Sequence, residues 1–463
     1  MIRWVVVIGL TLIGVVSCSQ GVSPRAGTPT DKTADPAGSH QAAIAAQVQP
    51  FLDAEVVSGL VVGIYDAGKL EIYGFGAGPG GARPNGRTLF ELGSVTKVYT
   101  SLVLADAVQR KEVELDGPVA DLLPPGVTVP TKDGTAITLR HLAVHVSGLP
   151  RLPPSLLAKA GSRDPYAGYS EDALYQDLIA TELIVAPGTA FEYSNFGAGL
   201  LGFALGRKIG PDFPRALRTR VLDPLGLRDT YVVVPASEAG RRAQGTTNDL
   251  KATPPWTFDA MAGAGALVST ARDQLTVIAA ELDAITGSKE PLRAAMRLTQ
   301  EKQMDQQAQN AGLGWIIDRN GRYWHNGGTG GFHAFIGFDP STKRGVVLLA
   351  STSTSLVDRL ADVLYQVLDG KPPSPVVFPT PDKLASYAGT YDFSGSKLTI
   401  RADGKRLYIE GPGEPPRRLA PISDHEFLLE ELQALAIFQR EGDKIARIVF
   451  VLDGKQLAAP RVE

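Results

Sequence analysis

The sequence predicts an α/β protein in which one antiparallel sheet is assembled from strands near both ends of a main domain. Strand-like runs occur at 60–66 and 69–76 and return between 312 and 350, and the chain between them has helical periodicity interrupted by Gly and Pro. A mainly helical region is therefore expected as an insertion into the sheet. Beyond residue 383, alternating apolar and polar runs between turn residues predict a separate small antiparallel β domain.

The first residues have the parts of an export signal. Arg3 provides a basic start, and the apolar run from Trp4 to Val16 is shorter than the roughly 20 residues that a membrane-spanning helix needs. The run ends in Val15-Val16-Ser17-Cys18, which resembles the lipobox of bacterial lipoproteins. That resemblance implies a signal peptide over 1–18 and lipidation of Cys18, with the protein anchored in the bacterial cell envelope on its periplasmic or extracellular face. An ordinary cleaved signal is the alternative.

The rest of the chain divides by composition. Residues 19–42 are rich in Ser, Gly, Pro, Thr and Asp without apolar periodicity, which indicates a disordered tether. The main domain is expected over 43–370, a Pro-rich linker over 371–382 and the C-terminal β domain over 383–463.

Periodicity then places the elements of the main domain. A helix is expected at 43–52, followed by a hairpin whose turn is Ala67-Gly68. Further helices are expected at 94–111, 138–145, 170–182, 195–208, 213–223, 269–283 and 355–368. The later strands are expected at 312–318, 322–325, 332–338 and 345–350.

Charge and motif content argue against several classes of function. The 46 Lys and Arg nearly balance 49 Asp and Glu and form no cluster, which argues against a nucleic-acid partner. A Gly-x-Ser-x-Gly elbow is absent from the sequence, which argues against the α/β-hydrolase fold. His141 and His145 have the spacing of a zinc pair but lack the adjacent Glu of the metalloprotease motif, so we expect neither a metal nor a cofactor.

A serine and a lysine three residues apart begin a predicted helix at Ser94-Val-Thr-Lys97. Residues with this spacing share one helical face, so the amine can reach the hydroxyl and act as the base that a serine nucleophile needs. The same spacing recurs at Ser394 and Lys397 in a predicted hairpin, so the motif alone is weak. A capping serine with a surface lysine is the alternative for Ser94.

Two more segments make the pattern specific. Tyr193-Ser194-Asn195 stands at a predicted helix start, and His325-Asn326-Gly327-Gly328 stands in a Gly-rich turn between two expected strands. With the serine and lysine they follow the order S-x-x-K, Y-x-N and H-x-G. The chain over about 45–370 therefore resembles the superfamily of class C β-lactamases, low-molecular-mass penicillin-binding proteins and β-lactamase-like esterases. The segments FELGSVTK, HVSGLP, YSNFGAGLLG and HNGGTGGF all fit that family.

The resemblance implies a role for each motif residue. Ser94 is implied as the nucleophile of an acyl-enzyme, Lys97 as the group that takes its proton, and Tyr193 as a partner in acid and base steps. Asn195 is implied to hold the acyl amide carbonyl. The oxyanion is expected to lie between the backbone N–H groups of Ser94 and Gly328, where a close approach of the strand suits glycine. Lys97 or Tyr193 must then be partly deprotonated at neutral pH, and the two would titrate as a unit.

The third motif departs from the β-lactamase pattern. His325, which with Gly327 completes the implied substrate-binding set, stands where those enzymes carry a lysine that helps to hold the substrate carboxylate. A histidine is only partly charged at neutral pH. We therefore expect weaker carboxylate recognition that improves in mild acid.

The resemblance implies a small-molecule or peptide substrate. D-Ala-D-Ala peptides, in a carboxypeptidase-like reaction, or β-lactams are the first interpretation. An esterase and a non-catalytic, penicillin-recognising envelope protein are the alternatives. The C-terminal domain, which opens with LASYAGTYDF, resembles a small lipocalin-like β domain. It could shape the cleft, bind envelope components or only stabilise the protein.

Overall fold

The computed structural model describes residues 35–159, 161–287, 290–305, 310–452 and 454–462. The expected signal peptide, Cys18 and most of the expected tether lie outside these ranges. Residues 35–40 do not belong to a disordered tether, because the carbonyl of Pro36 accepts the N–H of Ile72 and Asp35 pairs with Arg272 at 2.8 Å. Within the described ranges, no helix has both the length and the apolar character needed to cross a membrane.

The main sheet confirms the prediction that both ends of the main domain build one sheet. Its eight strands are antiparallel in the order β2-β1-β10-β9-β8-β7-β6-β5, and Val62 of β1 faces Leu348 of β10 in register. The strands are β1 (Gly59–Asp66), β2 (Lys69–Gly76), β5 (Met304–Asp305), β6 (Asn310–Ala311), β7 (Ile316–Ile317), β8 (Tyr323–Gly328), β9 (His333–Asp339) and β10 (Arg344–Ala350).

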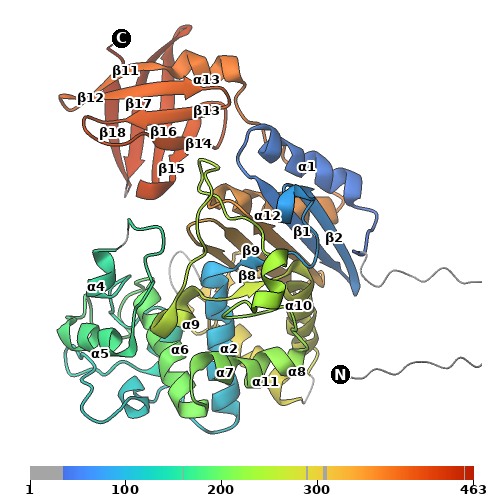
Figure 1. Cartoon of the computed structure of the whole chain (residues 1–463), viewed down its shortest axis with the longest axis vertical. Helices are drawn as coiled ribbons and strands as arrows, with labels where there is room; N and C mark the ends of the chain where they lie inside the picture. Colours follow the sequence, from blue (N-terminus) through green and yellow to red (C-terminus); the bar gives the residue numbers. More distant parts are fainter. Residues whose placement is uncertain (1–34, 160, 288–289, 306–309, 453, 463) are drawn as a thin grey trace, which may run out of the picture. The chain divides into compact units, whose positions relative to one another are not determined.

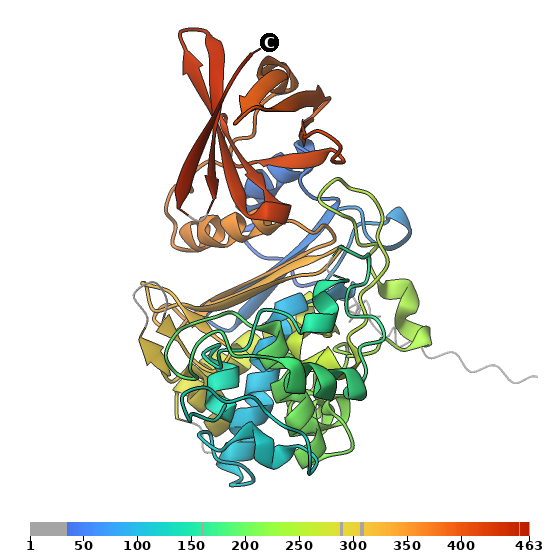
Figure 2. The same cartoon turned by 90° about the vertical axis from the view of Figure 1, so that its left-hand side faces the viewer.

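Helices cover both faces of this sheet (Figures 1 and 2). Because successive side chains of a strand point to opposite faces, Val61 packs in one core and its neighbour Val62 in another. The core around Val62 is closed by α1 (Gln41–Asp53) and α12 (Asp358–Leu368). The core around Val61 is closed by α2 (Thr96–Gln109) and α10 (Ala271–Ile285), and it extends into the inserted helical region.

The inserted region is mainly helical, as the sequence predicts. Its remaining helices are α3 (Leu139–Ala143), α4 (Pro154–Leu157), α5 (Glu171–Ala180), α6 (Asn195–Ile209), α7 (Phe213–Leu217), α8 (Asp223–Leu225), α9 (Ala262–Gly265) and α11 (Pro291–Gln300). Strands β3 (Phe90–Glu91) and β4 (Val268–Ser269) form a separate pair. The sequence analysis missed α11, which begins at a proline and buries Leu292 and Met296.

The structure corrects two local predictions that concern the site. Ser94 does not lie in the first turn of the α-helix but in the 3₁₀ turn η2 (Gly93–Val95), where Gly93 adopts a φ of +51°. The segment His325–Gly328 is not a turn: it forms the second half of β8, and residues 329–332 make the connection to β9. Glycine content suggested the turn, but pairing with β9 extends the strand through both glycines.

The C-terminal domain is an antiparallel sheet of eight strands in sequence order. A bridge between Tyr391 and Arg461 brings the last residues beside the first strand, so the sheet is nearly closed. The strands are β11 (Gly389–Phe393), β12 (Ser396–Asp403), β13 (Arg406–Glu410), β14 (Arg417–Pro421), β15 (Glu426–Leu429), β16 (Ala434–Glu441), β17 (Lys444–Leu452) and β18 (Lys455–Pro460). A helix that the sequence analysis did not expect, α13 (Pro381–Tyr387), precedes them (Figure 1).

Polar contacts join this domain to the main one. The buried side chain of Arg418 donates hydrogen bonds to the backbone carbonyls of Asn248 and Glu55, the latter at 3.0 Å. Glu430, in the short turn η8 (Glu430–Leu432), accepts the N–H of Ser355 at 2.7 Å. These contacts place η8 beside the end of β10 that leads into α12.

Candidate active site

Ser94 and Lys97 are in direct contact. Lys97 Nζ lies 2.8 Å from Ser94 Oγ and 2.8 Å from the carbonyl oxygen of Ala264. The lysine side chain is buried and has no carboxylate partner among the described residues. Burial, with a smaller contribution from the charge of Arg151, lowers the pKa of Lys97 well below its ordinary value. A lysine in this state can hold or release a proton at the serine hydroxyl.

The N-terminal part of α2 fixes this lysine against α9 and the residues that follow it. Thr96 Oγ1 accepts the N–H of Leu267 at 3.0 Å, and Thr100 Oγ1 donates to the carbonyl of Gly263 at 2.8 Å. Lys97 thus lies between two side chains that bond to the same segment. These contacts satisfy the hydroxyls of Thr96 and Thr100, so both residues can be buried in the first turns of α2.

Tyr193 lies on the other side of the lysine. Lys97 Nζ is 4.9 Å from the centroid of its ring. Burial raises the pKa of Tyr193 to about 12, although a hydrogen bond with Ser94 and the charge of Arg151 act in the opposite direction. The phenol therefore keeps its proton at neutral pH, and of the two groups Lys97 is the one that the site favours in its deprotonated form.

His145 packs against Tyr193. Its ring packs on the ring of Tyr193 with centroids 4.4 Å apart, and its Nδ1 accepts the N–H of Ser194 at 3.2 Å. His141, its partner in the sequence motif, serves instead in the capping box that starts α3 with Thr138.

Asn195 begins α6 and faces the same cavity. Its backbone N–H donates to the carbonyl of Arg151 at 2.9 Å, and its Nδ2 donates to the hydroxyl of Tyr166 at 2.9 Å. The second hydrogen of Nδ2 remains available, since an amide nitrogen carries two donors. Tyr166 is itself held by stacking on Phe258 at 4.6 Å.

Strand β8 lies against the turn that carries Ser94. A Cβ atom on Gly327 would lie 2.4 Å from the backbone nitrogen of Ser94, and one on Gly93 would lie 2.8 Å from that of Gly328. At Gly328 itself a Cβ would meet no protein atom nearer than 3.7 Å. The close approach inside the protein therefore requires glycine at Gly327 and Gly93. The close approach to a substrate that the sequence analysis expects at Gly328 stays a prediction.

His325 is buried in the middle of β8, and its ring carries no charge at neutral pH. Burial lowers its pKa to about 4, and the charge of Lys97 acts in the same direction. Nδ1 lies 2.5 Å from the carbonyl oxygen of Asn326, so in the neutral ring Nδ1 carries the proton and Nε2 is an acceptor. The improvement in carboxylate binding that we expected in mild acid would therefore need a pH near 4.

A second histidine, whose role the sequence left open, belongs to a small polar network beside the cavity. His333 Nε2 lies 2.7 Å from one oxygen of Asp358, and Asn326 Nδ2 donates to the other at 2.6 Å. Although burial opposes the charge, Asp358 raises the pKa of His333. His333 is therefore already paired with a carboxylate.

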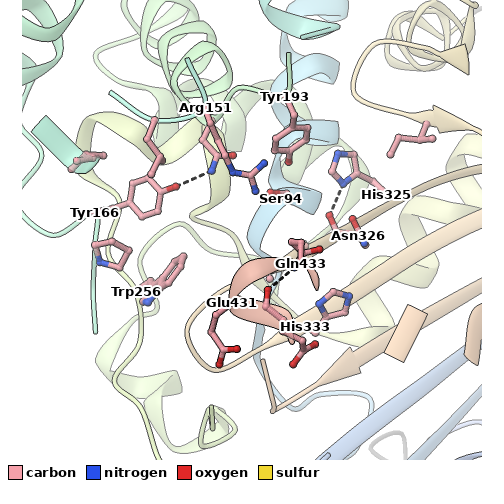
Figure 3. Close-up of a pocket in the computed structure, with 18 of the residues that line it drawn as sticks. Ser94, Arg151, Tyr166, Tyr193, Trp256, His325, Asn326, His333, Glu431 and Gln433 are labelled. Carbon is pink, nitrogen blue, oxygen red and sulfur yellow. Dashed lines mark hydrogen bonds between the residues drawn. The ribbon is translucent and has the colours of Figure 1, made fainter. Parts of the chain in front are cut away.

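Most of the motif residues line one cleft of about 910 Å³ (Figure 3). Ser94, Tyr193, Asn195, His325, Gly327 and Gly328, which the sequence analysis brought together, line it. Lys97 lies beneath Ser94. The cleft also has lining residues that sequence reasoning missed, namely Arg151, Tyr166, Trp256, Glu430, Glu431 and Gln433.

The missed residues differ in how far the sequence could have shown them. Arg151 directly follows the HVSGLP segment, so its proximity to the motif was a usable signal. Glu431 and Gln433 come from the C-terminal domain, and the sequence pattern carried no signal for them. Their position favours the interpretation in which this domain shapes the cleft.

Comparisons with known proteins agree with this geometry. A family model described as Beta-lactamase matches residues 44–370. The chain is 28% identical over 310 residues to the D-alanyl-D-alanine-carboxypeptidase/endopeptidase AmpH of Escherichia coli K12, covering 63% of this chain and 79% of that one. It is 27% identical over 362 residues to a β-lactamase of the same organism, covering 70% and 91%.

Solved structures show the same fold. The class C β-lactamase of Rhodobacter sphaeroides superposes with a TM-score of 0.61 at 26% identity, covering 72% of this chain and 99% of that one. Fold and site thus define a serine hydrolase with a serine, a lysine and a tyrosine in one cleft. The chain belongs to the β-lactamase family.

Proposed function

We propose that the protein hydrolyses its substrate through an acyl-enzyme on Ser94, with Lys97 as the general base. The observation that carries this proposal is the 2.8 Å contact between Lys97 Nζ and Ser94 Oγ at a buried lysine whose pKa is lowered. Neutral Lys97 takes the hydroxyl proton while Ser94 Oγ attacks the carbonyl carbon. The negative charge on the carbonyl oxygen is stabilised by the N–H groups of Ser94 and Gly328.

Collapse of this intermediate breaks the bond to the leaving group. The leaving group takes a proton from Tyr193, whose raised pKa keeps the phenol protonated, and the proton on Lys97 restores that of Tyr193. Asn195 holds the acyl amide carbonyl through the free hydrogen of Nδ2. His325 and Gly327 form the part of the cleft wall that β8 provides. A water molecule then attacks the acyl carbon and loses a proton to Lys97. Lys97 returns that proton to Ser94 Oγ as the bond between Oγ and the acyl carbon breaks and the acid is released.

For the substrate, we propose D-Ala-D-Ala peptides in a carboxypeptidase-like reaction, or β-lactams. This is supported by the similarity to AmpH and to several β-lactamases. An esterase is the second candidate, and the neutral state of His325 supports it because a simple ester has no carboxylate to bind at the third motif. A non-catalytic, penicillin-recognising protein is the remaining alternative.

We also propose that Cys18 is lipidated and anchors the protein in the bacterial cell envelope. The support is the lipobox-like ending of the apolar N-terminal run. Replacement of Cys18 by serine should move the protein from the membrane fraction to the soluble fraction and abolish labelling by a fatty acid. A variant that remains in the membrane fraction would contradict the anchor.

The decisive experiment for the mechanism is intact mass spectrometry of the protein with a penicillin, alongside turnover of D-Ala-D-Ala peptides and short esters. A penicilloyl adduct that Ser94→Ala abolishes, with peptide cleavage, supports the carboxypeptidase. Ester turnover that depends on Ser94, without an adduct, supports the esterase. No adduct and no turnover would contradict the catalytic proposal and leave the non-catalytic one.

A further inference from the structure

Arg151 is a cation in the cleft that the proposed mechanism does not use. Its backbone is fixed, because its carbonyl accepts the N–H groups of Asn195 at 2.9 Å and of Phe196 at 3.3 Å. Its side chain is exposed and lines the cleft with Ser94. The guanidinium carbon lies 5.2 Å from the centroid of the Tyr193 ring, and Figure 3 shows the side chain reaching toward Ser94.

The guanidinium has no hydrogen-bond or ion-pair partner in the part of the chain that the structure describes. None of the hydrogen bonds or ion pairs between described residues involves its nitrogens, whereas Arg220, Arg241 and Arg242 each contact a carboxylate. The acidic residues of the cleft are engaged elsewhere: Glu430 accepts from Ser355, and both Glu430 and Glu431 accept from Asn248. Five N–H donors with a permanent positive charge are thus presented to the cleft.

The other cationic side chains around the cleft do not fill this role. His325 stays neutral above pH 4 and His333 is paired with Asp358. Lys97 is buried beneath Ser94 and faces its hydroxyl. Arg151 is therefore the cation available to a carboxylate in this cleft. In the enzymes that carry a lysine in the third motif, that lysine provides the cation instead.

The position of Arg151 also indicates which part of the substrate it meets. It borders Asn195, which the proposed function assigns to the acyl carbonyl, and Tyr193. The third-motif strand instead approaches the backbone of the turn that carries Ser94, through Gly327 and Gly328. We propose that Arg151 forms an anion subsite that binds a carboxylate on the acyl side of the scissile bond. The inference rests on the proposed acyl-enzyme mechanism and narrows its substrates to acyl donors that carry a free carboxylate.

Two esters with the same leaving group test this directly. The 4-nitrophenyl monoester of glutaric acid has a free carboxylate on its acyl chain, and the 4-nitrophenyl methyl diester carries a neutral methyl ester in its place. We expect the wild-type protein to prefer the carboxylate form in kcat/KM. Arg151→Gln should lower kcat/KM for the carboxylate ester by about 10- to 100-fold relative to the neutral ester, the range expected for a hydrogen bond to a charged group.

The ratio of the two kcat/KM values isolates binding from catalysis. Arg151 also lowers the pKa of Lys97, but both esters use the same base, so a change in its titration cancels in the ratio. Arg151→Lys should restore part of the preference through its charge. Arg228→Gln, at an exposed arginine that does not line the cleft, makes the same change in net charge and should leave the ratio unaltered.

Three results would contradict the proposal. An unchanged ratio of the two kcat/KM values in Arg151→Gln would show that the carboxylate binds elsewhere. A wild-type protein that does not prefer the carboxylate ester would show that the cleft has no such subsite. A similar fall of the ratio in Arg228→Gln would show that the effect comes from the net charge of the protein and not from a contact with Arg151. In each case turnover of the neutral ester that depends on Ser94 leaves the proposed mechanism intact, and its absence would overturn the mechanism separately.

Discussion

The ammonium nitrogen of Lys97 lies 2.8 Å from the hydroxyl oxygen of Ser94, in a buried position without a carboxylate partner among the described residues. A buried lysine without an acid costs stability when it is charged, and that cost favours the neutral amine, the form that can accept a proton. This relationship links the stability of the fold to the proposed chemistry, and the first two predictions follow from it.

Replacement of Lys97 by methionine should lower activity without lowering stability. We expect kcat/KM for an ester to fall by about 100- to 10,000-fold, the range of general-base catalysis. The midpoint of thermal unfolding should stay the same or rise, because methionine fills the space without a group to desolvate. Lys397→Met, in the second S-x-x-K of the chain, is the matched control and should leave turnover unchanged. Loss of turnover in the control, or none in Lys97→Met, would contradict the assignment.

The pH dependence of kcat/KM should report the titration of Lys97. Because its folded pKa is lowered, activity should be present at neutral pH and should fall as the pH drops through that pKa. The raised pKa of Tyr193, about 12, keeps the phenol protonated on the alkaline side. Arg151→Gln should move the acidic limb to higher pH, since it removes a nearby positive charge. An acidic limb in the range of an ordinary lysine, near pH 10, would contradict this prediction.

The same pKa has a consequence for stability. The folded state binds the Lys97 proton less tightly than the unfolded state does. The free energy of unfolding should therefore rise as the pH rises from the folded pKa of Lys97 to its unfolded value of about 10.4. Lys97→Met should therefore reduce the rise of the free energy of unfolding with pH in the alkaline range. Urea titrations at several pH values measure the free energy of unfolding of the wild type and of Lys97→Met. If this free energy depends on pH in the same way in both proteins, the pKa of Lys97 is not lowered.

The two histidines of the H-L-A-V-H segment should respond differently to alanine. His145→Ala removes the ring that packs on Tyr193 and the acceptor of the Ser194 N–H, so kcat should fall while KM changes little. His141→Ala removes only a capping interaction and should cost about 0.5–2 kcal/mol of stability without a comparable loss of kcat. Steady-state kinetics and urea unfolding of both variants measure the two effects. Equal losses of kcat in His145→Ala and His141→Ala would refute the distinction.

Glycine should matter more at 327 than at 328 for the fold. A methyl group on Gly327 would lie 2.2 Å from the carbonyl oxygen of Leu92 and 2.4 Å from the nitrogen of Ser94, so the strand must move away from the serine turn. We expect Gly327→Ala to destabilise the protein by about 1–3 kcal/mol, as overpacking does, and to abolish most turnover. Gly328→Ala should cost less than about 0.5 kcal/mol. Equal destabilisation in urea unfolding would show that the two positions are not distinguished by packing.

Glu281, a buried carboxyl far in sequence from the motifs, should make stability depend on pH. Burial raises its pKa to about 8 from an ordinary value near 4.5. The folded state then holds a proton that the unfolded state has lost, so the free energy of unfolding should fall as the pH rises from about 4.5 to 8. Glu281→Gln should flatten this dependence, and Glu441→Gln, at an exposed position, should not. An unaltered slope in Glu281→Gln would contradict the raised pKa.

The sequence predicted the main sheet well because its strands are continuous apolar runs. The runs at 60–66 and 345–350 each fill both faces of the sheet, and their pairing in β1 and β10 follows from burial. Helix α11 was missed although its buried residues Leu292, Ala295, Met296 and Thr299 have helical spacing. The short strands β5 to β7 were missed or misjudged because each has two residues, too few to show a period. The Gly-rich third motif was taken for a turn, since local composition does not reveal the partner strand that extends β8.

The sequence by itself determined the family, the order of the three motifs and the pairing of Ser94 with Lys97, because one turn of chain brings residues three apart to the same face. Tertiary structure alone decided the charge state of the site. The desolvation that lowers the pKa of Lys97 and of His325 depends on atoms from distant segments, and so does the open position of Arg151. Electrostatic energy depends on burial and on distances in space, and neither is a property of local sequence.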